Sequence, residues 1–240
     1  MGRGHAVRAP ALILVLSLLA PSTGEAAYRF GDGVYLGSAS LLPDWAETLQ
    51  RARDQHPILD ACVADAERCE GYLRGIPVLL QRARPLSRER QLQLINRYIN
   101  KRRYRGDRTL EITSALSEET VRLPSRWSTL LEFLRRGGDC EDYATSKYQL
   151  LRALGIPAHD LRVVVVFDRA SRDHHAVLAV RQDDDGAAWL LDSDDRIYRG
   201  QPFGYRFIYA LNETSIWDHE VDGDTVFPVT QPQEQPEDSS

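Results

Sequence analysis

The stretch GGDCEDYATSKYQLLRALG, residues 137–155, decides the fold of this chain of 240 residues. Two glycines end the preceding segment, acidic residues follow at once, and Gly155 closes the stretch. Acids in a first turn and a glycine after the last turn are typical of the two ends of an α-helix. The stretch therefore predicts an amphipathic helix that begins near Asp139 and carries Cys140 in its first turn.

Four segments that follow this helix predict β-strands, because each is rich in apolar and β-branched or aromatic residues and is bounded by turn residues. They are LRVVVVF (161–167), HHAVLAV (174–180), AWLLD (188–192) and YRFIYAL (205–211). The first is apolar on both faces, which places it in the centre of a sheet covered on both sides. The predicted fold class is α+β, with helices first and an antiparallel sheet after them.

The chain up to Tyr104 is predicted to be helical. PDWAETLQRARDQ (43–55) and SRERQLQLINRYINKRRY (87–104) place apolar residues at helical spacing with charged residues between them. We therefore expect a helical lobe over residues 27–105 and, over residues 106–228, a region that holds the Cys140 helix and the sheet.

Serines predict the N-caps of two helices. Ser87 precedes the second N-terminal helix, and Ser128 precedes STLLEFLRRGG, a short helix that the glycines at 137 and 138 end.

Residues 82–108 carry ten basic side chains against two acidic ones, Glu89 and Asp107. Such a run is most often a solvated helix face. The alternative is a docking surface for an acidic partner or for membrane headgroups.

Both ends of the chain predict segments outside the domain. Residues 1–26 begin with Arg3 and Arg8, continue with an apolar run too short to span a bilayer, and end in small residues, the pattern of a cleaved secretory signal. Residues 229–240 are predicted to be a disordered tail. Without residues 1–26 the formal charge changes from −5 to −6. That charge does not suggest a nucleic-acid-binding protein, and we expect an exported protein that does not span the membrane.

Three cysteines, Cys62, Cys69 and Cys140, remain in the expected mature chain. Cys62 and Cys69 are seven residues apart, and on one straight helix they would lie about 10 Å apart along the axis, too far for a disulfide. A bridge therefore requires a turn between them, near Asp65 or Ala66. We predict this bridge, which leaves Cys140 as a free thiol in an oxidising compartment.

Cys140 lies between two acidic residues, Asp139 and Glu141. The helix N-terminus favours a thiolate, but nearby negative charge disfavours it, so a histidinium partner is expected. The candidates are His174 and His175.

Adjacent strand residues face opposite ways, so only one of His174 and His175 can meet the helix, and composition alone does not say which. Asp192 follows the next strand and could orient the imidazole. A cysteine at a helix start, a histidine on a strand and a carboxylate on the following strand are the arrangement of papain-like nucleophilic sites. A zinc site of Cys140 with both histidines is less favoured, since adjacent strand histidines diverge.

Three motifs together resemble the bacterial transglutaminase-like cysteine proteinases of the LapG type. They are GGDCEDYATSKYQLLRALGIP, then HAVLAV with His175 35 positions after Cys140, then LLDS with Asp192 17 positions further. The resemblance implies a papain-like, transglutaminase-like fold. It also implies that Cys140 is the nucleophile, His175 the general base and acid, and Asp192 the orienting residue. One departure is Ser193, where the family is associated with asparagine.

The resemblance further implies a calcium-dependent periplasmic endopeptidase. Asp139, Glu141 and Asp142 match the positions that hold the ion. The implied substrate is a large exported adhesin, cut near its N-terminus to regulate biofilm attachment, and the implied partner is an inner-membrane cyclic-dinucleotide-responsive receptor. Two alternatives stay open: a transglutaminase or amidase that uses the same residues on another acceptor, and a non-catalytic binding module.

Overall fold

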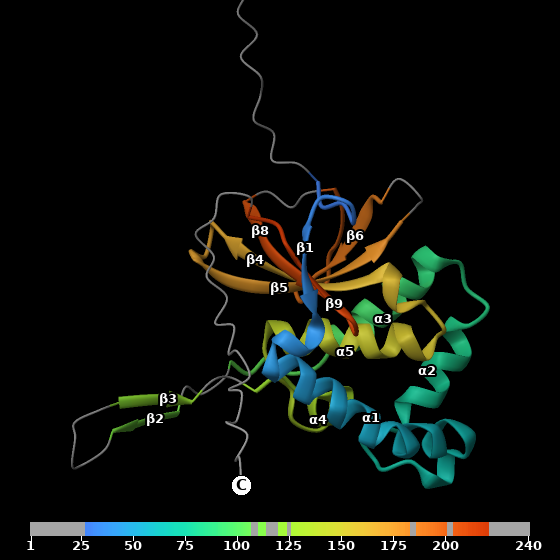
Figure 1. Ribbon diagram of the computed structural model, residues 1–240. Helices are drawn as coiled ribbons and strands as arrows, with labels where there is room; N and C mark the ends of the chain where they lie inside the picture. Colours follow the sequence, from blue (N-terminus) through green and yellow to red (C-terminus); the bar gives the residue numbers. More distant parts are fainter. Residues whose placement is uncertain are drawn as a thin grey trace, which may run out of the picture.

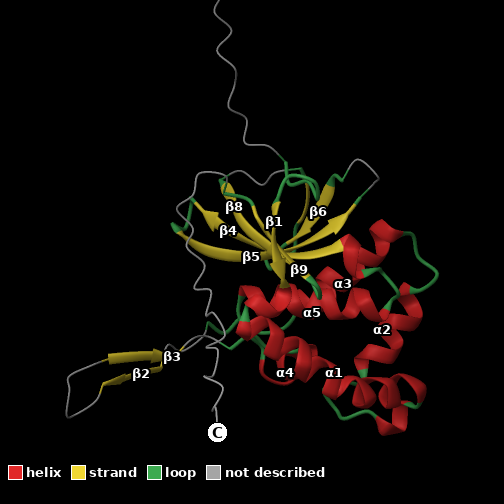
Figure 2. Cartoon of the chain, in the orientation of Figure 1, coloured by secondary structure: helices red, strands yellow, loops and turns green. Residues whose placement is uncertain are grey.

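The computed structural model describes residues 27–106, 110–113, 120–123, 126–182, 186–200 and 204–220. A curved antiparallel sheet forms one layer and a group of helices covers one of its faces (Figure 1). The cartoon coloured by secondary structure shows the same division between strands and helices (Figure 2). This arrangement confirms the predicted α+β class.

The main sheet has seven strands in the order β1-β9-β8-β4-β5-β6-β7, and every neighbouring pair is antiparallel. Its strands are β1 (Val34–Ser38), β4 (Leu161–Asp168), β5 (Asp173–Arg181), β6 (Ala188–Leu191), β7 (Ile197–Arg199), β8 (Tyr205–Leu211) and β9 (Ser215–Asp218). A separate pair consists of β2 (Leu110–Thr113) and β3 (Thr120–Leu123). The predicted central strand is β4, which has three strands on each side.

Five α-helices lie in the described part of the chain: α1 (Pro43–Ala64), α2 (Gly75–Ala83), α3 (Arg88–Asn100), α4 (Leu130–Arg136) and α5 (Cys140–Ala153). Short 3-10 turns are η1 (Ala39–Leu41), η2 (Ala66–Arg68) and η3 (Ala158–Asp160). Helix α5 packs on β4 and β5 and is flanked by α3 and α4 (Figure 1). It is therefore the element through which the helices meet the sheet.

Both faces of the central strands are covered, as their composition predicts. On the helix face Leu161 and Val163 join the large core that contains α5. On the other face Val164 and Val166 pack in a second cluster with Tyr28 and Phe30. Burial on both sides explains why β4 is apolar at almost every position.

The prediction that the chain is helical up to Tyr104 is wrong for its first part. Residues 34–38 form β1, which pairs with β9 at the edge of the sheet. Tyr28 and Phe30 cover the sheet face opposite the helices. The helices that were predicted from residues 43–55 and 87–104 are present as α1 and α3, and Ser87 occupies the N-cap of α3.

The predicted cap of the short helix α4 is also wrong, by one residue. Thr129 and not Ser128 is the N-cap, and its hydroxyl accepts a hydrogen bond from the N–H of Glu132. The Glu132 carboxylate accepts from the N–H of Thr129 in return, which completes a capping box. The N–H of Ser128 is instead directed at Asp142.

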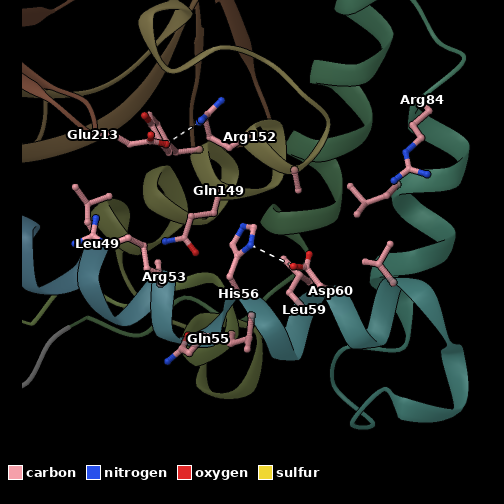
Figure 3. Close-up of a pocket in the computed structure, with 16 residues that line it drawn as sticks. Leu49, Arg53, Gln55, His56, Leu59, Asp60, Arg84, Gln149, Arg152 and Glu213 are labelled. Atoms are coloured by element: carbon pink, nitrogen blue, oxygen red, sulfur yellow. Dashed lines mark hydrogen bonds and ion pairs between the residues drawn. The ribbon is translucent and has the colours of Figure 1, made fainter.

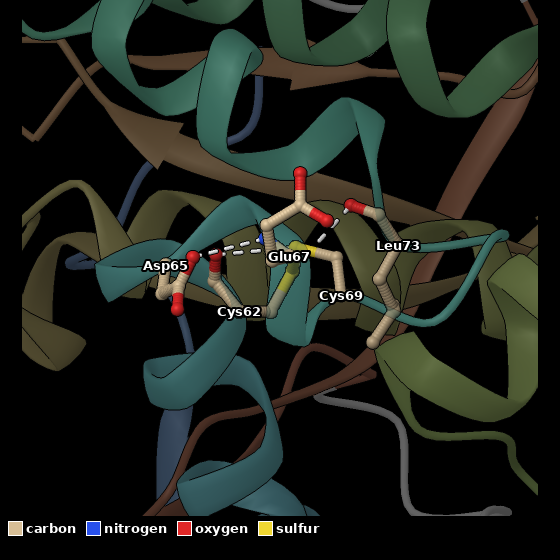
Figure 4. Close-up of a disulfide and its surroundings, with 5 residues drawn as sticks. All are labelled: Cys62, Asp65, Glu67, Cys69 and Leu73. Atoms are coloured by element: carbon tan, nitrogen blue, oxygen red, sulfur yellow. Dashed lines mark hydrogen bonds between the residues drawn. A yellow bond between two sulfur atoms is a disulfide. The ribbon is translucent and has the colours of Figure 1, made fainter.

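Cys62 and Cys69 form the predicted disulfide (Figure 4). Helix α1 ends at Ala64, and Asp65 adopts an extended conformation before the short turn η2. This break brings the two Cα atoms to 4.4 Å from each other. The turn between the cysteines lies where their spacing requires it.

Native, unreduced protein is expected to have one alkylatable thiol per chain, that of Cys140. Breaking the Cys62–Cys69 bridge should lower the free energy of unfolding by about 2–3 kcal/mol, since it closes only a short loop. Mass spectrometry after iodoacetamide treatment checks the first point, and denaturant unfolding of a Cys62→Ala/Cys69→Ala variant checks the second. Three modified cysteines in unreduced protein would contradict the bridge.

Residues 1–26 and 229–240, the predicted signal and tail, lie outside the described residues. Within the described part of the chain, each helix is too short or too polar to cross a bilayer.

Candidate active site

Cys140 is the first residue of α5, as the sequence predicts. Asp139 occupies the N-cap position, but its side chain makes no capping hydrogen bond. The first N–H groups of a helix have no partner within the helix and form a positively polarised end. Cys140 therefore sits where backbone dipoles favour negative charge on sulfur or on an adjacent oxygen.

The two glycines before Cys140 have separate structural reasons. Gly137 has a φ of 77°, and a Cβ there would collide with the carbonyl oxygen of Arg103. Gly138 has no room for a Cβ because the carboxylate of Asp142 lies over it. The buried Asp142 accepts a hydrogen bond of 2.5 Å from the N–H of Ser128. The Gly-Gly pair thus allows the turn before Cys140 to pack closely against its surroundings.

The segment after α3 holds this turn in place. Tyr104 forms a parallel β-bridge with Gly138, and the N–H of Arg105 donates to the Gly138 carbonyl at 2.8 Å. The exposed ring of Tyr104 stacks on Tyr143 of α5 with 6.0 Å between centroids. The turn that presents Cys140 is therefore tied to a segment about 35 residues earlier in the chain.

The Cys140 thiol lies among acids, as its sequence neighbours predict. Its sulfur donates to the Glu141 carboxylate at 3.2 Å. Burial raises the pKa of the Cys140 thiol well above its ordinary value, and the charge of Glu141, its hydrogen bond and the charge of Asp139 raise it further. A hydrogen bond from the N–H of Ala176 acts in the opposite direction. Burial and the neighbouring acids therefore favour the neutral thiol over the thiolate.

His175 and Asp192 are brought together. The Nε2 atom of His175 lies 2.7 Å from Oδ1 of Asp192, and the His175 side chain is about one-fifth exposed. His174 is exposed, and its ring lies edge-on to Phe167 at 5.8 Å. The contact with Asp192 distinguishes the two histidines, which composition alone does not.

The Cys140 thiol lies beside the part of β5 that has no pairing partner in β6. The pairing of β5 with β6 begins at Leu178, so the part of β5 before it is not paired on that side. The Ala176 N–H that bonds the Cys140 sulfur belongs to this part and directly follows His175. The Cys140 sulfur is therefore bonded to the residue that directly follows His175 on β5.

Asp192 is the most tightly held member of the set. It is 1% exposed, its Oδ2 accepts from the Tyr205 hydroxyl at 2.7 Å, and its Oδ1 accepts from the N–H of Ser193 at 2.6 Å. Burial alone would raise the pKa of the Asp192 carboxyl, but the bonds from His175, Tyr205 and Ser193 outweigh burial and hold that pKa below its ordinary value. The carboxylate is therefore ionised and oriented towards the imidazole.

Three residues around Asp192 were not identified from the sequence: Tyr205, Lys147 and Asn100. Lys147 Nζ and Asn100 Nδ2 donate to the main-chain oxygen of Asp192 at 2.8 and 2.7 Å. Tyr205 appears in the sequence only as part of a strand pattern, and Asn100 as the end of a helix. A lysine on the apolar side of a predicted helix is the one signal that the sequence offers.

The three predicted metal ligands occupy the N-terminus of α5. Asp139 and Asp142 are buried and Glu141 is half-buried. Within the described ranges, no three His, Cys, Asp or Glu side chains are gathered closely enough to hold a metal ion. Carboxylate oxygens are hard donors of the kind that calcium prefers, so the donor set fits calcium in type. In this structure Glu141 and Asp142 are engaged by the thiol and by Ser128.

A cavity of about 480 Å³ lies elsewhere, between α1, α2 and the C-terminal half of α5 (Figure 3). Its walls include the His56–Asp60 and Arg152–Glu213 pairs, with 3.5 and 2.6 Å between their charged atoms. None of the predicted site residues lines it. The cavity is therefore separate from the candidate site.

A thiol at a helix N-terminus, a histidine on the neighbouring strand and a buried carboxylate bonded to that histidine are typical of cysteine hydrolases that act through a thioester. The chain belongs to the family of bacterial transglutaminase-like cysteine proteinases, whose family model matches residues 58–220. It is therefore a transglutaminase-like cysteine protease by family. A search of curated proteins found no match.

Solved structures of Legionella pneumophila LapG share the fold. The calcium-bound form is 22% identical, with a TM-score of 0.57 over 70% of this chain and 91% of that one. The EGTA-treated form is also 22% identical, with a TM-score of 0.54 over 69% of this chain and 87% of that one. These structures confirm the predicted transglutaminase-like fold.

Proposed function

We propose that this protein is a calcium-dependent periplasmic cysteine endopeptidase that cleaves a large exported adhesin near its N-terminus and so regulates biofilm attachment. The observation that carries the proposal is the 2.7 Å contact between His175 and the buried Asp192. Beside this contact, the N–H of Ala176, the residue after His175 on β5, donates to the Cys140 sulfur. Membership of the cysteine proteinase family supports it.

In the proposed reaction the Cys140 sulfur attacks the carbonyl carbon of a peptide bond while His175 takes the thiol proton. The N–H groups at the start of α5 would donate to the oxyanion that forms. The C–N bond then breaks, His175 returns the proton to the leaving amine, and a thioester on Cys140 remains. Water, deprotonated by His175, hydrolyses this thioester and releases the free thiol.

Asp192 orients the imidazole in this scheme. Its carboxylate accepts from Nε2 of His175, so the other ring nitrogen, Nδ1, is the one available to the thiol. The bonds from Tyr205 and Ser193 restrict the carboxylate to one position. A buried, ionised Asp192 also stabilises the imidazolium that forms in each step.

Calcium would be held by Asp139 and Glu141, with Asp142 as a further ligand, and would supply positive charge beside the nucleophile. Here the Glu141 carboxylate accepts the thiol hydrogen and, with burial, raises the pKa of Cys140. The same carboxylate therefore opposes ionisation of the sulfur whenever its charge is not offset. Calcium-bound and EGTA-treated forms of LapG support the choice of this ion.

Removing calcium with a chelator is expected to stop cleavage reversibly. Added calcium should restore activity and magnesium should do so poorly, because the smaller ion demands a stricter octahedral geometry. Calcium should also raise the melting temperature of the wild type, since a ligand that binds only the folded state stabilises it. Asp139→Ala should abolish both effects. Full activity in excess chelator, with no calcium in the purified protein, would contradict calcium dependence.

The experiment that tests the protease assignment uses N-terminal fragments of candidate exported adhesins. Purified protein is incubated with each fragment in ¹⁸O-labelled water, and new termini are mapped by mass spectrometry. Hydrolysis should place one heavy oxygen in the new carboxyl terminus. Products joined to an added amine instead would support the transglutaminase alternative, and intact fragments in every case would contradict the proposed function. The non-catalytic alternative predicts binding without new termini.

Export and control of the enzyme belong to the same proposal. The pattern of residues 1–26 supports secretion, with a mature N-terminus near Ala27. An inner-membrane receptor that responds to a cyclic dinucleotide would hold the mature enzyme away from its substrate. N-terminal sequencing of protein from a periplasmic extract tests the first part, because an unprocessed Met1 would contradict it.

A further inference from the structure

Lys147 is a fully buried lysine on the helix that carries Cys140. Its exposed fraction is 0%. The chain contains only two lysines, Lys101 and Lys147, and otherwise uses arginine as its cation. Burying an ammonium group in the core is unfavourable unless a specific partner compensates it. The ammonium group of lysine is compact and sits on a flexible side chain, so it suits a narrow site with a single hydrogen-bond acceptor. The planar guanidinium of arginine does not suit such a site.

The partner of Lys147 is the main chain of Asp192. Lys147 Nζ donates to the Asp192 carbonyl oxygen at 2.8 Å, and Asn100 Nδ2 from α3 donates to the same oxygen at 2.7 Å. The N–H of Asp192 donates to the carbonyl of Arg196 at 3.2 Å. The main chain of Asp192 is thus fixed at both its oxygen and its nitrogen, independently of the bonds made by its carboxylate.

This link connects two parts of the candidate site that come from different layers. Cys140 and Lys147 are seven residues apart on α5, about two helical turns, and so move as one rigid body. Asp192 directly follows β6 in the loop that leads to β7. The hydrogen bond from Lys147 therefore sets the distance between the nucleophile-bearing helix and the loop that carries the carboxylate.

We propose that Lys147, assisted by Asn100, is a positioning residue for the catalytic site: it fixes the main chain of Asp192 relative to α5 and, through the Asp192 carboxylate, orients His175 towards Cys140. The proposal rests on the proposed function only in naming the reaction, because the contacts among Lys147, Asn100 and Asp192 stand without it.

The charged surroundings of Lys147 are defined by three elements. Asp192, Asp194 and Asp195 face it from the loop after β6, and the ring of Tyr143 lies 5.9 Å from Nζ on α5 itself. From α3 it faces the uncharged Asn100. Burial lowers the pKa of Lys147 to about 7, and the three carboxylates oppose this effect only in part.

The direction of the pH effect follows from this lowered pKa. Between about pH 7 and the ordinary lysine range, the unfolded chain binds a proton at Lys147 that the folded chain does not, so stability rises with pH there. Below pH 7 both states hold the proton and the full penalty of burying the charge remains. Replacing Lys147 by methionine removes this penalty, so the variant should gain stability relative to the wild type as the pH falls from the ordinary lysine range to about 7, and this gain should stay constant below pH 7.

The test compares Lys147→Met with the exposed-lysine control Lys101→Met. Two rates are measured: carboxamidomethylation of Cys140 by iodoacetamide, and cleavage of an adhesin fragment that the wild type cuts. Lys147→Met should lower kcat about 10- to 100-fold with little change in KM, because the reacting groups are misplaced while substrate contacts remain. It should also slow the alkylation, and Lys101→Met should leave both rates unchanged.

A double-mutant cycle separates positioning from a merely structural role. If Lys147 acts through Asp192, Lys147→Met/Asp192→Ala should be no slower than Asp192→Ala alone. Additive losses in the cycle, or wild-type rates for a folded Lys147→Met, would overturn the proposal. If Lys147→Met does not fold, Asn100→Leu removes the second donor to the same carbonyl and should give a smaller loss with the same non-additivity; wild-type rates or additive losses for Asn100→Leu would then overturn it.

Failure of the proposed function would look different. If the wild type cleaves no adhesin fragment, the protease assignment fails, but the iodoacetamide rates of the wild type, Lys147→Met and the double variant still decide the role of Lys147.

Discussion

Replacing Cys140 by alanine is expected to reduce cleavage by about 10⁴-fold or more, because no thioester can form without the sulfur. Cys140 is the one free cysteine in the part of the chain that the structure describes. Cleavage of an adhesin fragment by wild type and variant, followed by gel or mass analysis, measures the loss.

The fold of Cys140→Ala should survive the change. Cys140 is only partly buried, and its replacement removes a single hydrogen bond, from the thiol to the Glu141 carboxylate, so only a small change in stability is expected. Matched circular dichroism and melting curves serve as the control. A folded Cys140→Ala that cleaves at more than a few per cent of the wild-type rate would remove Cys140 from the mechanism.

The second large effect is expected from the adjacent histidines. His175→Ala should slow cleavage by about 10³- to 10⁴-fold, because it removes the group that takes and returns the proton. His174→Ala should change the rate by no more than about twofold, since an exposed residue away from special contacts contributes little. The same fragment assay, run with both variants side by side, provides a matched pair that differs by one position.

The structural reason for this difference is the contact with Asp192. His175 lies 2.7 Å from the carboxylate, whereas the exposed His174 only lies edge-on to the ring of Phe167, with 5.8 Å between centroids. A large loss of cleavage rate in His174→Ala, with a small loss in His175→Ala, would show that His174 and not His175 supplies the imidazole that meets the thiol. Equal, small effects of both changes would mean that neither His174 nor His175 acts as the base.

The elements that position the nucleophile follow from local sequence signals. Acids and glycines at the two ends of 137–155 predict α5, and it begins at Cys140 as expected. The doubly apolar run at 161–167 predicts the central strand, and β4 occupies that place. The signals for α5 lie within a few residues of its two ends, and the signal for β4 is its uniformly apolar composition. Both elements can therefore be predicted from the sequence alone.

The elements that were missed depend on distant partners. Residues 34–38 expose most of their side chains, and their strand structure comes from hydrogen bonding to β9, far along the chain. Tyr28 is buried because it covers Val164 and Val166. No local sequence pattern around Tyr28 predicts this contact. Strand formation at such positions is set by tertiary context and not by propensity.

The candidate site also combines features that the local sequence predicts with features that depend on tertiary packing. Strand alternation places Ala176 and Leu178 on the side of α5, and His175 on the other. Alternation combined with the observed position of α5 would therefore favour His174 as the partner of Cys140. The Cys140 sulfur instead accepts a hydrogen bond from the Ala176 N–H, in the part of β5 that precedes its pairing with β6. The pairing of β5 with β6 begins only at Leu178, and sequence spacing does not reveal this.

The acids around Cys140 also have roles that their spacing does not separate. Asp142 is buried over Gly138 and bonds the N–H of Ser128, whereas Glu141 is half-buried and meets the thiol. One residue therefore shapes the turn and the other controls the charge on sulfur. Adjacent carboxylates look alike in the sequence, and only the packing around each distinguishes them.

The most direct test of the account follows activity as Cys140 is progressively alkylated. Native, unreduced protein with calcium is treated with iodoacetamide for increasing times, the modified fraction of Cys140 is measured by mass spectrometry, and cleavage of an adhesin fragment is measured in the same samples. The remaining activity should equal the unmodified fraction of Cys140 and reach zero when one thiol per chain is blocked. Undiminished cleavage by protein that is fully alkylated at Cys140 would contradict the account.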